Sequence, residues 1–456
     1  MRRQSNFGGP YPDGVTTVSQ PRYRATNPAC DLVDDPLRPP HESEAADLEG
    51  WAVPISLDVV RIGAGCGIRT RALAPALLAL SIAGYLIVHH LAHHSSGDLI
   101  VYRGEGAAVR SGRDLFGTLY GPAGSATYAA TYPPFAALLF VPLSYPPVAA
   151  LVALGVAANV CLLTIVVRLA FRLADTPSLD LSTLCAAVAL LIWAEPVFTT
   201  LRFGQIDLLL LALVLWDFAR ATGTRAHGIG VGLAAGIKVT PLIFIGYLLL
   251  TRRLRAAVTG AVTFVATLAV SGLVLPQATD EFWTRDLFDL RRVGPLEQAD
   301  NQSLRGLLVR MDHTRHTAPG ELLLIVVVAV AGLACAAVAY RRFGDAWGLP
   351  ACAVTGLLVS PISWTHHWVW CVPIAIATWQ HERRWLPAVL IFWTHAVWAV
   401  PHHDGVELGF TPLQIGLSSW YVLFGLGFLI LLGRSTLVGR ASRSPERDDQ
   451  TAVSLC

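Results

Sequence analysis

The sequence predicts an all-α polytopic membrane protein, and three observations lead to this fold class. The chain of 456 residues is 54% hydrophobic and only 14% charged, whereas soluble domains carry roughly 25% charged residues. Its mean hydropathy is +0.51. Apolar segments of about 20 residues, the length that crosses a bilayer as a helix, follow one another between two polar termini. The composition excludes an ordinary soluble domain, and the chain lacks the basic stripe of a nucleic-acid-binding protein.

Ten apolar segments are candidates for membrane-spanning helices. They are residues 72–92, 147–170, 181–198, 204–219, 254–276, 321–340, 346–362, 367–380, 385–400 and 412–433. Two further segments are ambiguous, because 133–145 is short and bounded by prolines and 228–250 is interrupted by Lys238 and Pro241. We expect these two to be re-entrant or to cross as a pair. The predicted total is therefore about 10–12 transmembrane helices.

The polar parts of the chain predict its topology. Residues 1–68 are polar and lack an apolar period, which is typical of a disordered tail. Arginines cluster at segment ends, and the positive-inside rule puts these ends, the tail 1–68 and a second tail, 434–456, in the cytoplasm. The transmembrane domain is then 69–433, with two long outer loops, 93–132 and 277–320. Such long loops are usually functional, and their aromatic residues indicate order.

The first outer loop contains the predicted catalytic base, Asp98. It lies in the stretch GDLIVY, about ten residues beyond the apolar core of the preceding segment. An isolated loop aspartate is usually a solvated residue, but here the apolar pair Leu99 and Ile100 follows it. We expect this pair to press the carboxylate against the bilayer face. Burial raises the pKa of a carboxylate and makes it a usable base near neutral pH. Tyr102 is the accompanying candidate for substrate binding.

A second polar stretch, RFGQID at 202–207, opens another apolar segment. One interpretation is helix capping, with the aspartate near the positive end of the helix. The functional interpretation is that Arg202 and Gln205 contact the phosphate or the sugar hydroxyls of a substrate.

Lys238 is the one lysine of the chain and lies inside an apolar segment, in GIKVTP. A charged residue within a membrane segment is costly and is a candidate site residue by default. Pro241 breaks the helix beside it. The alternative is that the side chain extends to the membrane surface. The functional interpretation is that the ammonium group binds a lipid phosphate.

A third polar stretch, NQSLRG at 301–306, lies in the second long loop. It matches a glycosylation sequon, a pattern that is common by chance. Amides and guanidinium groups also bind sugar hydroxyls and phosphates. Asn301 and Arg305 are therefore candidates for substrate binding.

Two adjacent histidines, His366 and His367, lie in SPISWTHHW at the start of an apolar segment. The flanking tryptophans are expected at a membrane surface, but this does not account for the histidines, which we predict to bind substrate. Adjacent residues on a helix point about 100° apart, so the pair is not expected to share one metal ion. The sequence predicts no metal site and no cofactor.

Taken together, these stretches resemble the polyprenol-phosphate-mannose-dependent α-mannosyltransferases of the actinobacterial envelope, a family with the GT-C fold. The stretches that carry the resemblance are GDLIVY, YPPF, RFGQID, GIKVTP, NQSLRG and SPISWTHHW, in this order over about residues 73–433. The tail 1–68 lies outside it.

The resemblance implies an integral membrane glycosyltransferase of the GT-C type in the plasma membrane, with its active site on the extracytoplasmic face. It implies that mannose moves, with inversion, from a polyprenyl phosphate to a hydroxyl of a lipid-anchored mannoside. An α-1,2 linkage is expected, with phosphatidylinositol mannosides or lipomannan-type lipids as acceptors. The acidic residue of the first outer loop is the base of the family, which matches Asp98, and no metal ion is implied.

Alternative functions remain open at this point. The same fold could transfer arabinose or glucose from a polyprenyl phosphate, or bind a glycolipid without catalysis. Broken helices and intramembrane charge also occur in lipid transporters. A transporter would be expected to show inverted repeats, and the two halves of this sequence show no convincing similarity.

Overall fold

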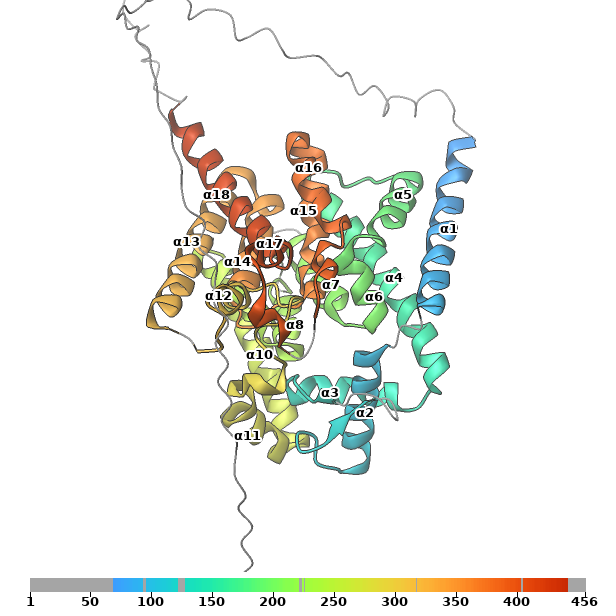
Figure 1. The fold of residues 1–456 in the computed structure, drawn as a ribbon. Helices are drawn as coiled ribbons and strands as arrows, with labels where there is room; N and C mark the ends of the chain where they lie inside the picture. The colour runs from blue at the N-terminus through green and yellow to red at the C-terminus, as the bar shows by residue number, and fades with distance from the viewer. Residues whose placement is uncertain are drawn as a thin grey trace, which may run out of the picture. The chain divides into compact units, whose positions relative to one another are not determined.

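The structure is a computed structural model that describes residues 69–92, 96–121, 128–220, 224, 226–316, 318–402 and 405–441. The predicted tail 1–68 and residues 442–456 lie outside these ranges. The described chain is almost entirely helical (Figure 1). Its one sheet, within these ranges, is a hairpin in which β1 (Leu119–Tyr120) pairs antiparallel with β2 (Tyr128–Ala129). The predicted all-α class is therefore confirmed.

Long apolar helices supply the membrane-spanning part. The longest are α1 (Arg69–Leu91), α4 (Val148–Leu173), α10 (Leu254–Val274), α13 (Pro319–Phe343) and α18 (Trp420–Ala441). By length and composition, four helices among the described residues can each cross a membrane: those ending at Leu91, Leu173, Val274 and Phe343. A fifth crossing is possible for the pair α5 (Leu181–Leu191) and α6 (Glu195–Phe203), which is bent by 78°. The chain is a multi-pass membrane protein, and the count of 10–12 spans stays a prediction.

Shorter elements fill the space between these helices. The α-helices are α2 (Gly97–Ser111), α3 (Pro134–Phe140), α7 (Asp207–Phe218), α8 (Ile229–Ile237), α9 (Ile243–Leu250), α11 (Pro276–Thr284), α12 (Leu304–Asp312), α14 (Asp345–Val359), α15 (Cys371–His381), α16 (Leu386–Val389) and α17 (Pro412–Leu417). The 3-10 turns include η2 (Val141–Ser144), η3 (Thr240–Leu242), η4 (Asp286–Phe288), η5 (Leu290–Arg292), η6 (Thr365–Trp370), η7 (Arg383–Trp385), η8 (Leu390–Trp393), η9 (Ala396–Ala399) and η10 (Val406–Gly409). Of the two ambiguous segments, 228–250 is broken, into α8 and the continuous pair η3 and α9, whereas 133–145 is one short helix, α3 continued by η2.

One predicted span, 385–400, is wrong because it is not a continuous helix. It consists of η7, α16, η8 and η9, and His395 interrupts it with a φ of 50°. The indole Nε1 groups of Trp393 and Trp398 donate hydrogen bonds to Leu190 O and to the Glu195 carboxylate. These polar contacts hold the segment against the bend between α5 and α6, so it folds around that bend instead of forming one rod.

The predicted span 412–433 is also divided, into α17 and α18, and α18 continues into the segment predicted as a polar tail. The backbone carbonyl of Ser418, at the break, accepts a hydrogen bond of 2.6 Å from Gln302 Nε2. Arg310 Nη2 donates to the same carbonyl and to Ser419 Oγ. Buried side chains from α12 and the residues before it therefore satisfy the backbone groups that the break leaves open.

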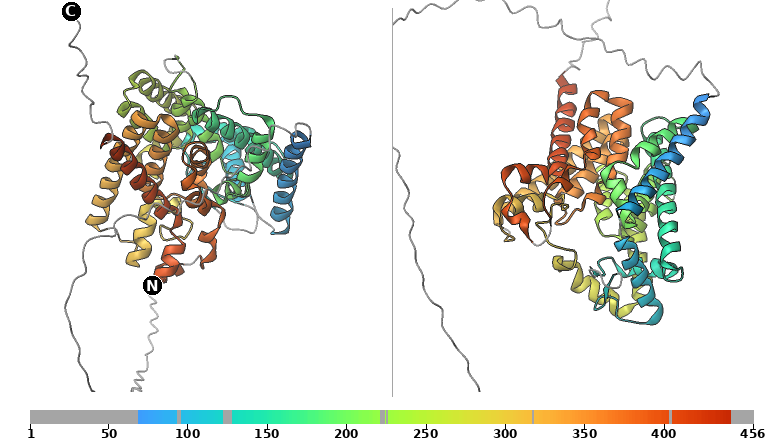
Figure 2. Two further views of the ribbon diagram at one scale, coloured as in Figure 1. Left: turned by 90° about the horizontal axis from the view of Figure 1, so that it is seen from above. Right: turned by 45° about the vertical axis from the view of Figure 1, so that its right-hand side comes forward.

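The two ends of the membrane region differ in composition. The C-terminal ends of α4, α13, α15 and α18 converge around one polar cavity, which is lined by Asp175, Arg342, His381 and Glu382 among others. Four of the arginine clusters of the sequence lie at these ends: Arg168 and Arg172, Arg341 and Arg342, Arg383 and Arg384, and Arg434 and Arg440. At the opposite end lie α2 and α11, from the two long outer loops, and α3, from the segment 133–145 (Figures 1 and 2). Long loops and arginine-rich ends are thus separated, as the predicted topology requires.

The first outer loop is ordered around Leu99, which is only 6% exposed. The contact differs from the predicted one, because Leu99 packs against protein and not against the bilayer. A Cβ added at Gly204 would lie 2.7 Å from Leu99 Cβ, and one added at Gly155 would lie 2.7 Å from Leu99 Cδ2. Gly204 also ends α6 with a φ of 71°, in the left-handed region. Both requirements, close approach and positive φ, favour glycine at this position.

Replacing Gly204 by alanine should destabilise the protein. The substitution combines an unfavourable φ with a collision against Leu99, and such backbone strain costs about 1–3 kcal/mol. We expect the thermal unfolding midpoint of the purified protein in detergent to fall by several degrees. Gly427→Ala is the matched control, because nothing lies within 4 Å of a Cβ there and alanine is the better helix former. An unchanged midpoint for Gly204→Ala would show that the Leu99 contact is not tight.

Candidate active site

Gln205 connects the predicted base to two tyrosines. Its Nε2 donates a hydrogen bond of 2.6 Å to Asp98 Oδ2, across 107 positions of sequence. Its Oε1 accepts one of 2.6 Å from Tyr102 OH and one of 3.2 Å from Tyr132 OH. The two tyrosine hydroxyls lie 3.0 Å apart. Because a carboxylate only accepts and the hydroxyls can donate, the network assigns the orientation of the Gln205 amide.

Asp98 is held where a base is needed. It lies in the first turn of α2, and Gly204 brings the residue after it, Gln205, alongside the start of that helix. Burial raises the pKa of the Asp98 carboxyl to about 6, although the hydrogen bond from Gln205 lowers it. Asp207 raises this pKa further, and Lys238 lowers it. A carboxyl with this pKa is ionised at neutral pH and binds a proton more readily than an exposed aspartate does.

A second polar group surrounds Lys238, where α8 ends. Lys238 has an extended backbone, because Pro241 follows and α8 does not continue. Its Nζ lies 3.0 Å from Asp207 Oδ1 and 2.9 Å from His367 Nε2. It also lies 5.4 Å from the centre of the Tyr132 ring, in cation–π range. The ammonium group therefore has a carboxylate, an imidazole and an aromatic face as partners, and its side chain is only 15% exposed.

His366 adds a neutral imidazole to this group. Its Nε2 lies 3.9 Å from Asp207 Oδ2. Burial lowers the pKa of His366 to about 4, because the charged form is poorly solvated there. Within the described part of the chain, neither of these two atoms has a hydrogen-bond partner. Buried polar atoms are normally satisfied, so this corner is suited to a ligand with hydroxyl groups.

Residues of the Asp98–Gln205 network and of the group around Lys238 line one cavity of about 340 Å³. Its wall combines α2, the β2 strand, the breaks after α6 and α8, the turns η4 and η5, and the segment 360–367. The polar lining residues include Asp98, Tyr102, Tyr132, Gln205, Lys238, His366, His367, Asp286 and Arg292. The structure thus brings together six residues that the sequence analysis singled out: Asp98, Tyr102, Gln205, Lys238, His366 and His367.

Three predicted site residues, Arg202, Asn301 and Arg305, lie outside this cavity. The Arg202 guanidinium stacks on Phe203 and Trp398 at the end of α6. Asn301 is fully buried, and its Oδ1 accepts from the backbone N–H of Ser363, so it orients the segment that carries Trp364 and the histidines. Arg305 belongs to the first turn of α12. Arg310 is the buried arginine of that helix, and it donates five hydrogen bonds to backbone carbonyls.

The sequence analysis missed Tyr132, Asp207, Asp286 and Arg292 as site residues. Tyr132 and Asp207 lie inside the recognised stretches YPPF and RFGQID. Their position in these stretches could have indicated that they are site residues. Asp286 and Arg292 belong to a charged stretch of the second loop that resembles a solvated surface. Nothing in the local sequence separates them from Asp289 or Arg291, which are close by.

Asp207, His366 and His367 could also hold a metal ion. Each offers one ligand atom, and these atoms lie within 4.8 Å of one another. The sequence argument that adjacent histidines point apart did not foresee this, because a 3-10 turn places both beside Asp207. Lys238 Nζ nevertheless contacts two of the three residues, and a metal ion bound there would compete with its charge.

Comparisons with known proteins give the family of the chain. The profile of glycosyltransferase family 87 matches residues 130–361, about half of the chain. This match covers Gln205 and Lys238, whereas Asp98 and the histidines lie outside it. No solved structure matches the chain.

Two curated relatives cover most of the chain. A protein of Mycobacterium tuberculosis is 37% identical over 314 residues, which are 68% of this chain and 72% of the relative. It is named polyprenol-phosphate-mannose-dependent alpha-(1-2)-phosphatidylinositol pentamannoside mannosyltransferase. A protein of Mycolicibacterium smegmatis is 32% identical over 372 residues, which are 74% of this chain and 83% of the relative. It is named polyprenol-phosphate-mannose-dependent alpha-(1-2)-phosphatidylinositol mannoside mannosyltransferase. This multi-pass membrane protein is an enzyme and belongs to glycosyltransferase family 87.

Proposed function

We propose that this enzyme transfers mannose from polyprenyl-phosphate-mannose to a hydroxyl of a lipid-anchored mannoside, forming an α-1,2 linkage with inversion. The relatives' names supply the donor, the linkage and phosphatidylinositol mannosides as the acceptor class. The observation that carries the proposal is that a carboxylate base and a buried ammonium group, Asp98 and Lys238, line one cavity. Sugar transfer from a phosphate requires both, a base for the hydroxyl and a positive charge for the leaving group.

In the proposed step, Asp98 accepts the proton of the acceptor hydroxyl while the hydroxyl oxygen bonds to the anomeric carbon of mannose. The bond from that carbon to the phosphate oxygen breaks, and its electron pair leaves with the polyprenyl phosphate. Gln205 and the two tyrosines orient the carboxylate. Lys238 faces the departing phosphate, and Asp207 fixes the position of its ammonium group.

We propose that Lys238, and not a metal ion or another cofactor, supplies the positive charge. The ammonium group already lies among the residues that could bind a metal. An ion pair of this kind is costly to bury and adds little to stability. A catalytic role accounts for its presence better than a structural one does.

A narrow apolar groove supports the binding of a polyprenyl chain. It shares Lys238, Thr240 and His367 with the main cavity and continues between α7, α9 and α14. Its apolar lining includes Leu210, Phe244, Ala353, Leu357 and Trp370. The groove begins at the proposed phosphate position, where the lipid tail of the donor must start. The segment 133–145 does not line it.

We also place the reaction at the outer face of the plasma membrane. The two long outer loops supply a large part of the cavity wall, and the arginine-rich helix ends lie at the opposite end of the membrane region. This polarity agrees with the positive-inside rule. Lipid-linked sugars are donors for transfer on the side of the membrane where nucleotide sugars are absent.

Asp98→Asn should reduce transfer from polyprenyl-phosphate-mannose by about a hundred-fold or more, the usual contribution of a general base. The amide can still accept a hydrogen bond, so the protein should insert and fold normally. Transfer is measured in membrane vesicles with radiolabelled donor, with the protein level as the control. Turnover at the wild-type rate would rule Asp98 out as the base.

The rate should depend on pH through Asp98, since only the ionised carboxylate accepts a proton. We expect activity to fall as the pH drops through about 6. Gln205→Leu removes the hydrogen bond that favours the charged form, so the pKa should rise and the acid limb should move to higher pH. The pH profile of kcat/KM tests this. An acid limb that stays in place, or moves to lower pH, would contradict the assignment.

Lys238→Gln should weaken use of the donor more than use of the acceptor. Loss of a charge-assisted hydrogen bond costs about 1.5–3 kcal/mol, so we expect KM for the donor to rise about ten-fold or more. Lys238→Arg keeps the charge and serves as the control. EDTA should leave the wild-type rate unchanged. An unchanged donor KM, or inactivation by EDTA with recovery on adding a divalent ion, would contradict the proposed role.

A further inference from the structure

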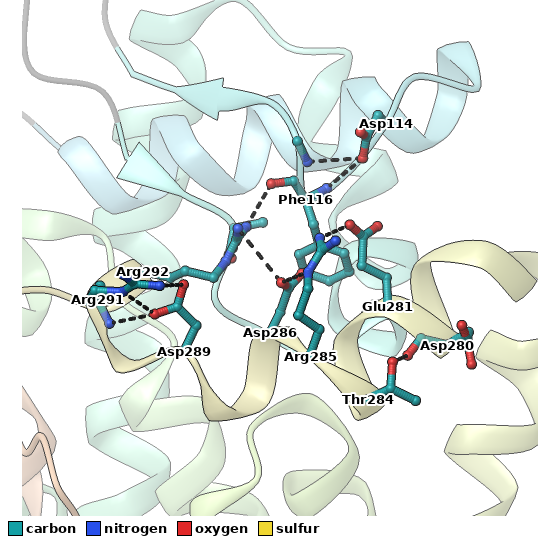
Figure 3. Close-up of polar contacts among 12 residues, drawn as sticks. Asp114, Phe116, Asp280, Glu281, Thr284, Arg285, Asp286, Asp289, Arg291 and Arg292 are labelled. Carbon is teal, nitrogen blue, oxygen red and sulfur yellow. Dashed lines mark hydrogen bonds and ion pairs between the residues drawn. The ribbon is translucent and has the colours of Figure 1, made fainter.

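A second polar pair lines the cavity apart from Asp98 and Lys238. Asp286 begins η4 and Arg292 ends η5, both in the outer loop 277–320 (Figure 3). Their Oδ1 and Nη1 atoms lie 3.9 Å apart. Neither residue has a part in the proposed transfer step. Their location on the wall of the same cavity raises the question of what they bind.

Arg292 is fixed by the first outer loop. Its Nη2 donates a hydrogen bond of 2.7 Å to Phe116 O and one of 3.3 Å to Ala130 O, and its guanidinium lies 5.7 Å from the centre of the Phe116 ring. Figure 3 shows the side chain reaching across to this loop. The guanidinium is therefore held in one place on the cavity wall, as a preorganised binding group would be.

Asp286 is only 8% exposed. Its Oδ1 accepts a hydrogen bond of 3.0 Å from Arg285 Nε. In the described ranges, its Oδ2 has no hydrogen-bond partner, and the same holds for Arg292 Nε. An acceptor and a donor are thus both unsatisfied in a buried pair on a cavity wall. Buried polar atoms without partners are uncommon, and a ligand that offers both donors and acceptors would satisfy them.

The charges of the pair decide the class of ligand. Arg285 also pairs with Asp286, and Glu281 pairs with Arg285 in turn. The two carboxylates and two guanidinium groups therefore carry no net positive charge, and the site does not favour a phosphate. It suits a neutral polyhydroxylated ring, whose hydroxyls donate to Asp286 and accept from Arg292. The aromatic residues Tyr128, Phe282 and Trp364 line the cavity as well, and they provide apolar surface for the carbon face of such a ring.

Shared packing also connects the segments that carry Asp286 and Asp98. Val101, one helical turn after Asp98, and Phe282, one turn before Asp286, belong to the same hydrophobic cluster. The segments that carry the two carboxylates are therefore joined through one hydrophobic cluster, in which α3 contacts both α2 and α11. A sugar bound at the pair would be held by the same rigid wall that positions Asp98.

We propose that Asp286 and Arg292 bind a neutral mannosyl ring of the acceptor and so select the acceptor saccharide. The proposal rests on the proposed function, because it assigns the two ends of one cavity to the two substrates. The phosphate of the donor binds at Lys238, and the hydroxylated acceptor binds at Asp286 and Arg292.

The test uses the full chain in detergent and octyl α-mannoside as the acceptor probe. Asp286→Asn keeps the shape and removes the charge, and we expect KM for octyl α-mannoside to rise about ten-fold while KM for the donor changes less than two-fold. Asp289→Asn is the matched control, since Asp289 lies three positions away and pairs with the exposed Arg291 (Figure 3). It should leave both constants unchanged.

Binding is measured separately, so that the test does not depend on turnover. In an Asp98→Asn background, the quenching of tryptophan fluorescence by octyl α-mannoside gives an apparent Kd, which Asp286→Asn should raise about ten-fold. Arg292→Lys keeps the charge but cannot reach both backbone carbonyls, and we expect the same direction of change. The unfolding midpoint of each variant must match that of its background.

Two results would overturn the assignment. Equal acceptor constants for Asp286→Asn and Asp289→Asn would show that Asp286 does not bind the acceptor. A lower donor KM in Asp286→Asn would show that the pair lies at the donor phosphate. Either result leaves the proposed transferase intact if the wild type is active and Asp98→Asn is not. Wild-type protein that transfers no mannose from polyprenyl-phosphate-mannose would instead overturn the proposed function.

Discussion

The hydrogen bond from Gln205 to Asp98 is the contact on which the site depends. It joins the first outer loop to the end of α6, and the other end of the same amide accepts from Tyr102 and Tyr132. One side chain thus sets the direction of the carboxylate and limits how far burial raises its pKa. It can do so only because Gly204 allows the backbone before it to lie against Leu99. The position of the Asp98 carboxylate and the packing of the first outer loop therefore depend on the same contacts.

The cavity combines two electrostatic environments that suit two different substrates. At one end, the ammonium group of Lys238 meets an apolar groove, which matches a phosphate attached to a lipid chain. At the other, a carboxylate and a guanidinium balance each other among aromatic residues, which matches an uncharged sugar. In the proposed transfer step, the charge of the wall thus distinguishes the two substrates on either side of Asp98.

The broken helices are the structural basis of the site. Helix breaks expose backbone groups, which a membrane protein tolerates only where protein or a cavity surrounds them. The break after α8 leaves Lys238 facing the cavity. The breaks after α5 and α17 are held by buried polar side chains, Glu195 and Arg310 among them. Asn301 likewise orients the backbone that carries His366 and His367. Buried polar residues outside the cavity, Asn301 among them, thus support the segments that form it.

Composition and local pattern determined much of this protein in advance. Apolar length dictates helices in a bilayer, and an isolated lysine and a proline mark a broken helix. A carboxylate just beyond a membrane segment marks a candidate site residue, which the structure places on the cavity wall. Only the tertiary structure decided which polar residues meet. Asp286 and Asp289 are alike in sequence, but one faces the cavity and the other faces away. Arg202 and Arg305 stay outside it, because helix ends and turns direct their side chains elsewhere. The physical reason is that the spacing of apolar residues specifies which face of a single helix is buried. Which residues of distant helices come into contact depends on how those buried faces pack together.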